Sequence, residues 1–271
     1  MAPFIFIVPG LYEGQRAFEP LAAALADLGY HRITLGRLAS TGTASKPGEK
    51  TVTMDDDSAF LARQLLEAVE TAGVEYVIVV LHSAGGFLGC GAMQGLSVAA
   101  RKSADKPGGI LKNIYIAAAL LPEGFKHMPL PWMENNASVP VPSHSPGIRN
   151  IFTSPRTGTQ TVMDVKLNMF NDCDDAEAER WIAEMQHQPA EGWDGVVQYC
   201  GWREIPGTYL LAENDNMLPV AKQEYFSSLA GANVVRIRAG HMAQLSRTAD
   251  VAKYISDVVQ GKIEVYLAGS I

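Results

Sequence analysis

The sequence has few cysteines and no close pair of them. Cys90, Cys173 and Cys200 form an odd, widely spaced set without a C-x-x-C pair. Small secreted domains instead carry even numbers of cysteines that build a disulfide framework. The three thiols suit a reducing compartment better than such a framework. We therefore expect the protein to work in the cytoplasm.

Long apolar runs are also missing. The stretch FIFIV near the start spans five residues and follows Ala2 and Pro3 without a basic region. It is too short for a signal peptide or a membrane span. We interpret it as the first strand, residues 4–8, and expect no membrane association.

Basic clusters and metal-ligand patterns are lacking too. The net charge is −7, and apart from the short run 55–57 the acidic residues are scattered. Nothing resembles the basic stripe that binds phosphate backbones or the glycine loop that cradles phosphates. The histidines His31, His127, His144 and His187 are not spaced as metal ligands. We expect no nucleic-acid partner, no metal and no cofactor.

What the sequence does contain is an alternation of strand-like and helical segments in a chain of 271 residues, 47% of them apolar. Residues 75–81, EYVIVVL, are a continuous apolar run typical of a strand covered on both faces. The alternation predicts an α/β fold with a mostly parallel sheet flanked by helices. The strands are expected at 4–8, 31–38, 75–81, 110–121, 207–213 and 233–240, and the helices at 18–30, 54–72, 84–103, 219–231 and 248–260.

The alternation stops between Pro122 and Glu204. This stretch is punctuated by prolines and contains one clear helical pattern, residues 174–186. We interpret residues 122–204 as a cap inserted into a single core that comprises residues 1–121 and 205–271. The tail 262–269 could add a short edge strand.

Ser83 is the candidate nucleophile. A serine hydroxyl is a poor nucleophile at neutral pH and needs a base, an acid that orients the base, and donors for an oxyanion. Ser83 lies between the buried strand 75–81 and a helix start with Gly85 and Gly86, which is the context of a nucleophile elbow. Leu81 departs from the G-x-S-x-G pattern and is expected to crowd the turn. The alternative is a serine that caps an ordinary helix.

His241 and Asp215 are the candidate base and orienting acid. Each follows its own predicted strand, and the chain order Ser, Asp, His is one in which such groups occur in parallel α/β folds. Glu213 is the second choice for the acid. The alternative for Asp215 is a turn residue, since its neighbours are asparagines and Pro219 follows.

The oxyanion donors are predicted to be the backbone amides of Leu11, in the loop after the first strand, and Ala84. Trp181 and Met185 are four residues apart on the helix of the cap. They could line a substrate pocket or pack the cap onto the core. Tyr12, His82 and Met242 are further candidates for the pocket.

At this point the sequence resembles the α/β-hydrolase superfamily, and within it the compact esterase-like branch that includes plant methyl esterases and hydroxynitrile lyases. The resemblance covers nearly the whole chain and rests on VPGLYEG, MDDDSAFLARQL, VVLHSAGG, the run from GLSVAARKS to AAALLPEG, GTYLLAENDNMLP and AGHMAQLS.

The resemblance implies a triad of Ser83, Asp215 and His241, with the amides of Leu11 and Ala84 as the oxyanion hole. Where the family usually has His-Gly in the first loop, this chain has Pro9-Gly10. Hydroxynitrile lyases of the branch carry a lysine directly after the catalytic histidine, whereas the esterases carry methionine. This chain has Met242, which favours ester chemistry.

We therefore expect a cofactor-free serine hydrolase of a small or medium apolar ester or lactone, acting through an acyl-enzyme. One alternative is a lyase or carbon–carbon bond hydrolase that uses the same triad, and another is a non-catalytic ligand-binding protein of this fold. The substrate's identity stays open, as does the oligomeric state, with a homodimer as one option.

Overall fold

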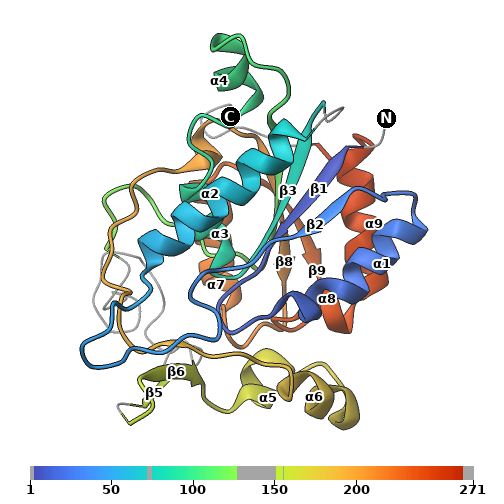
Figure 1. Cartoon of the computed structure of the whole chain (residues 1–271). Helices are drawn as coiled ribbons and strands as arrows, with labels where there is room; N and C mark the ends of the chain where they lie inside the picture. The colour runs from blue at the N-terminus through green and yellow to red at the C-terminus, as the bar shows by residue number, and fades with distance from the viewer. Residues whose placement is uncertain (1–2, 72–74, 127–150, 155, 265–271) are drawn as a thin grey trace.

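The computed structural model describes residues 3–71, 75–126, 151–154 and 156–264 (Figure 1). Several features predicted from the sequence lie wholly or mostly outside these residues: the prolines between 129 and 146, His127, His144 and most of the tail 262–269. In the part of the chain that is described, no helix is long and apolar enough to cross a membrane.

Six parallel strands form the central sheet, in the order β2-β1-β3-β4-β8-β9. This confirms the predicted α/β fold class. The strands are β1 (Phe4–Val8), β2 (Ile33–Leu35), β3 (Val77–His82), β4 (Ile110–Ile116), β8 (Gly207–Ala212) and β9 (Asn233–Ile237).

Helices cover both faces of this sheet (Figure 1). One face carries α1 (Glu19–Asp27), α8 (Ala243–Ser246) and α9 (Thr248–Val259), and the other carries α2 (Met54–Glu70), α3 (Gly85–Gly91) and α7 (Val220–Leu229). A short helical turn, η1 (Gln15–Phe18), precedes α1, and η3 (Gly201–Arg203) precedes β8.

Alternate side chains of the inner strands enter two hydrophobic clusters. Ile5 and Ile7 pack with α1 and α9, whereas Phe6 and Val8 pack with α2 and α3. Successive residues of a strand point to opposite faces, and in β1, β3 and β8 both faces are buried. This double burial explains why these strands have nearly continuous apolar sequences.

The single helix predicted for residues 84–103 is wrong. The segment forms α3, a turn, and then α4 (Val98–Ser103). Gly95 has a φ of +73° in the turn, a conformation that glycine adopts without strain. Ser97 then starts α4, because its Oγ accepts a hydrogen bond from the amide of Ala100 at 3.1 Å.

Between β4 and β8, the described residues form a second, smaller sheet (Figure 1). It is antiparallel, in the order β5-β6-β7, and the sequence analysis did not predict it. The elements of this stretch are β5 (Ile151–Ser154), β6 (Thr159–Val162), α5 (Val165–Met169), α6 (Asp175–Ile182) and β7 (Gln188–Pro189). The helix expected at 174–186 corresponds to the shorter α6.

Candidate active site

Ser83 occupies a strained turn directly after β3. Its φ is +51°, which is uncommon for a residue with a side chain. Its carbonyl oxygen accepts hydrogen bonds from the amides of Gly86 at 3.0 Å and Ala119 at 2.9 Å, and these contacts hold the turn. Strain of this kind persists only where the surrounding structure fixes it, and it is concentrated at functional sites.

Glycines make room for this turn. A Cβ on Gly85 would lie 2.4 Å from the carbonyl oxygen of Pro9, and a Cβ on Gly86 would lie 2.4 Å from the carbonyl oxygen of Ala119. Side chains at these two positions would therefore collide with the backbone. As expected from the sequence, the two glycines let α3 start close to the sheet.

Leu81 does not crowd the turn as the sequence pattern suggested. Its side chain is fully buried in the hydrophobic cluster that includes α2 and α3. A Cβ on Gly89 would lie 2.6 Å from Cδ2 of Leu81, so the glycine on α3 leaves the space that the leucine fills. The bulk of Leu81 is accommodated by α3, away from Ser83.

His241 lies in the loop after β9, with its side chain 1% exposed. Its Nε2 is 3.0 Å from Oγ of Ser83, and its Nδ1 is 2.8 Å from Oδ2 of Asp215. The structure thus brings the three predicted residues together in one chain of hydrogen bonds. This is the arrangement in which an imidazole can take a proton from a serine.

Asp215, in the loop after β8, makes the contacts expected under both interpretations that the sequence left open. Its Oδ1 accepts hydrogen bonds from the amides of Met217 at 2.8 Å and Leu218 at 2.7 Å, as a turn residue does. Its Oδ2 faces His241. Glu213 instead lies 3.8 Å from a guanidinium nitrogen of Arg236, at the surface. The geometry favours Asp215 over Glu213 as the orienting acid.

The loop after β1 passes close to Ser83. A Cβ on Gly10 would lie 2.6 Å from Cβ of Ser83. Within the described residues, the amide of Gly10 donates to Glu13, whereas the amides of Leu11 and Ala84 donate to no protein acceptor. Two amides near the serine are therefore available to an oxyanion, although their role stays a prediction.

The candidate pocket residues are largely buried. Tyr12, Trp181 and Met242 belong to one hydrophobic cluster, and Met185 packs against it. Burial raises the pKa of the Tyr12 hydroxyl well above its ordinary value. The carbonyl of Tyr12 also accepts a hydrogen bond from the amide of Gln186 at 2.9 Å. These contacts fit the packing alternative, and a role in substrate binding stays a prediction.

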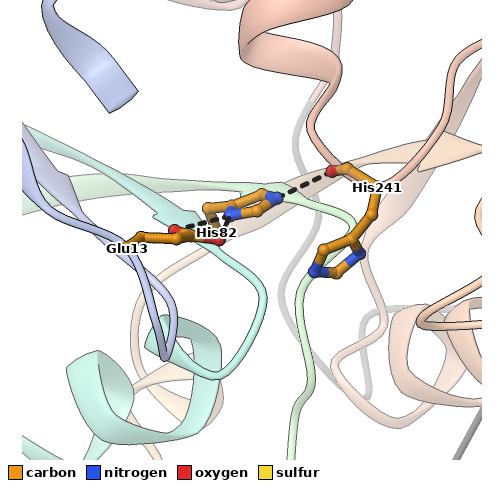
Figure 2. Close-up of side chains that lie close together, drawn as sticks. All are labelled: Glu13, His82 and His241. Atoms are coloured by element: carbon orange, nitrogen blue, oxygen red, sulfur yellow. Dashed lines mark hydrogen bonds and ion pairs between the residues drawn. The ribbon is translucent and has the colours of Figure 1, made fainter. Parts of the chain in front are cut away.

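His82, the fifth pocket candidate, is bound by protein groups on both sides of its ring. Figure 2 shows His82 between the carboxylate of Glu13 and the backbone carbonyl of His241. The sequence analysis missed Glu13. The available signal was a single acidic residue in the otherwise uncharged loop PGLYEG.

Glu13, His82 and His241 also form the group of residues whose types suit a metal ion. However, each ring nitrogen of the two histidines already has a protein partner: Glu13 and the carbonyl of His241 for His82, and Asp215 and Ser83 for His241. The arrangement is a hydrogen-bond network, and a metal ion there would have to displace these contacts.

The segment between β4 and β8 is attached to the loops that carry Asp215 and His241. Oδ2 of Asp172 accepts hydrogen bonds from the amide of Gly240 and the hydroxyl of Ser246, both at 2.6 Å. The side-chain amide of Asn171 donates to the carbonyl of Asn214 at 2.9 Å. These contacts hold the residues immediately before His241 and Asp215. That the segment acts as a cap over the site stays a prediction.

Comparison with known structures shows the same fold in several enzymes. Polyneuridine aldehyde esterase superposes with a TM-score of 0.70 at 20% identity, over 95% of this chain and 99% of its own. A pyrethroid hydrolase from Sphingobium faniae JZ-2 superposes with a TM-score of 0.68 at 19% identity, over 96% of this chain and 98% of its own. The methylesterase MES16 from Arabidopsis superposes with a TM-score of 0.67 at 16% identity, over 96% of this chain and 99% of its own.

Two sequence comparisons agree with the structural similarity. The α/β hydrolase nvfD of Aspergillus novofumigatus is 25% identical over 270 residues, which cover 98% of this chain and 100% of nvfD. The family model described as the alpha/beta hydrolase family matches residues 5–254, a range that contains Ser83, Asp215 and His241. The chain therefore belongs to the alpha/beta hydrolase family.

Proposed function

We propose that the protein is a serine hydrolase that cleaves a small or medium apolar carboxylic ester or lactone through an acyl-enzyme on Ser83. The observation that carries the proposal is the hydrogen-bonded chain from Asp215 through His241 to Ser83, with distances of 2.8 and 3.0 Å. Similarity to proteins named as esterases supports the ester class.

In the proposed reaction, Nε2 of His241 removes the Ser83 proton as Oγ attacks the carbonyl carbon. The amides of Leu11 and Ala84 stabilise the negative oxygen of the tetrahedral intermediate. The imidazolium then protonates the leaving alkoxide, and a water activated by the same histidine releases the acid. Asp215 stabilises the imidazolium in both halves.

These steps need no metal or cofactor, because serine, imidazole and carboxylate supply the nucleophile, the base and the orienting group. The apolar character of the substrate is proposed from the side-chain types of the pocket candidates Tyr12, Trp181 and Met242, which are aromatic or apolar. Met242 follows the proposed base directly, so no ammonium group stands there to stabilise a departing cyanide. This supports hydrolysis over cyanohydrin cleavage.

The test is hydrolysis of a panel of p-nitrophenyl and methyl esters by the wild type and by Ser83→Ala. We expect turnover by the wild type and a loss of about 10⁴-fold or more in kcat for the variant. Ser103→Ala, at an exposed position, is the matched control and should keep full activity. Equal activity of the wild type and Ser83→Ala would exclude Ser83 as the nucleophile.

A further inference from the structure

We propose that Glu13 and His82 act as positioning residues, a buried ion pair that fixes the backbone of His241 and the loop at Gly10 relative to Ser83. The inference rests on the proposed function, in which His241 is the base. It assigns a role to two residues that take no part in the acyl-enzyme chemistry.

The charge state follows from the hydrogen-bond partners. Nδ1 of His82 lies 2.8 Å from Oε1 and 3.0 Å from Oε2 of Glu13, and Nε2 lies 2.9 Å from the carbonyl oxygen of His241. A carboxylate and a carbonyl oxygen only accept hydrogen bonds. With Glu13 as a carboxylate, both ring nitrogens of His82 therefore carry a proton, and the ring is a cation paired with the Glu13 anion.

Burial makes the pairing necessary. The side chains of His82 and Glu13 are 1% and 0% exposed. A lone charge at this depth would be strongly unfavourable, and a hydrogen-bonded ion pair is the form that such a site tolerates. Burial is the largest single effect on His82 and lowers its pKa, but the Glu13 carboxylate, the carbonyl of His241 and the charge of Asp215 together outweigh burial, so the pKa is raised.

The other groups around the ring are compatible with this state. Among the described residues, the titratable groups that face His82 are Glu13, from the loop after β1, Asp215, from the loop after β8, and His241, whose ring centre is 4.9 Å away. The ring of Phe18 packs edge-on against His82, with 5.9 Å between the ring centres. The two carboxylates favour the cation.

The pair connects three loops at the carboxyl end of the sheet. Oε2 of Glu13 also accepts a hydrogen bond from the amide of Gly10 at 2.7 Å, next to the proposed oxyanion donor Leu11. His82 directly precedes Ser83, and its Nε2–H holds the carbonyl of His241 (Figure 2). One ion pair thus sets the relative positions of the oxyanion loop, the nucleophile and the base.

Two substitutions at His82 separate its two hydrogen bonds. His82→Asn places an amide donor near the position of Nδ1, toward Glu13, and leaves the carbonyl of His241 without a donor. His82→Gln places its donor near the position of Nε2, toward that carbonyl. If the hydrogen bond to the carbonyl of His241 positions the base, His82→Asn should have a much lower kcat than His82→Gln.

We expect His82→Asn to lower kcat on the ester panel by about 10- to 100-fold with KM within about 2-fold, because displacing a reacting group by an ångström costs about this much. His82→Gln should restore kcat to within about 5-fold of the wild type. His31→Asn, the same substitution at an exposed histidine, is the control and should behave as the wild type. Equal kcat for the Asn and Gln variants would overturn the positioning role.

A second measurement requires neither turnover nor a substitution. In ¹⁵N NMR of the wild type at pH 8, both ring nitrogens of His82 should carry protons, and Glu13→Gln should leave one of them deprotonated. A singly protonated His82 in the wild type would overturn the ion pair. If the wild type hydrolyses no ester through Ser83, the proposed function fails. The spectrum still shows whether His82 and Glu13 form an ion pair.

Discussion

At the residue scale, the carboxylate of Asp215 has a different task for each oxygen. Oδ1 holds the turn through the amides of Met217 and Leu218, and Oδ2 holds Nδ1 of His241. The hydrogen bonds to Oδ1 orient the carboxylate so that Oδ2 points toward His241. A proton on Nδ1 leaves Nε2 free to accept the proton of Ser83, so the carboxylate selects the tautomer that the proposed chemistry requires.

Asp215→Asn tests this selection. The amide oxygen can keep the contacts to the turn, and its NH₂ group then faces His241 and favours the tautomer protonated at Nε2. We expect kcat to fall by about 10⁴-fold, as loss of the correct tautomer does in a serine triad. Steady-state kinetics are the measurement.

Glu213→Gln is the matched control. Glu213 is two residues away and pairs with Arg236 and Arg238 at the surface. The kcat of its variant should therefore stay within about 2-fold of that of the wild type. A larger loss for Glu213→Gln than for Asp215→Asn would reassign the acid.

Ser83, Asp215 and His241 could be predicted to lie near each other, because each follows a strand of one parallel sheet. Glu13 and His82 could not be paired in this way. They are separated by 69 positions in the sequence, and their contact exists only because β1 and β3 are neighbours in the sheet. Periodicity shows where a strand is, and it does not show which strand lies beside it.

At the element scale, the start of α3 depends on backbone contacts that only glycine permits. The amide of Gly86 donates to the carbonyl of Ser83, and the carbonyl of Ala119 lies where a Cβ on Gly86 would stand. A methyl group there would push α3 away from the sheet and alter the turn at Ser83.

We therefore expect Gly86→Ala to lower the free energy of unfolding by about 2–3 kcal/mol, the upper range for overpacking a close contact. Urea denaturation measures the change. In the same helix, a Cβ on Gly91 would come closest to Oγ of Ser58, at 3.3 Å, and would lie 4.0 Å from the nearest backbone atom, so Gly91→Ala should change stability by less than about 1 kcal/mol. Equal effects of the two variants would disprove the requirement at Gly86.

Strands β1, β3 and β8 of the central sheet were the most predictable elements, because burial on both faces gives them nearly continuous apolar sequences. The antiparallel sheet β5-β6-β7 was not predictable in the same way. The sequence of β6 is TQTV and β7 contains only Gln188 and Pro189, so neither has the apolar alternation that marks a strand. The break between α3 and α4 was hidden because the apolar spacing continues through the turn.

At the scale of the whole molecule, the parallel sheet brings the loops after β1, β3, β8 and β9 to one edge. Those four loops hold Leu11, Ser83, Asp215 and His241. The segment between β4 and β8 is attached to the same edge through Asn171 and Asp172. A proposed nucleophile, its base and its oxyanion donors therefore come from distant parts of the chain, and the sheet brings them to one edge.

The central claim is that Ser83 becomes acylated during turnover. The most direct measurement is rapid quenching of the reaction with p-nitrophenyl acetate, followed by digestion and mass spectrometry of the peptide that contains Ser83. We predict that this peptide gains one acetyl group in the wild type and none in Ser83→Ala, together with a burst of p-nitrophenol. Turnover of the ester without any adduct on Ser83 would contradict the account.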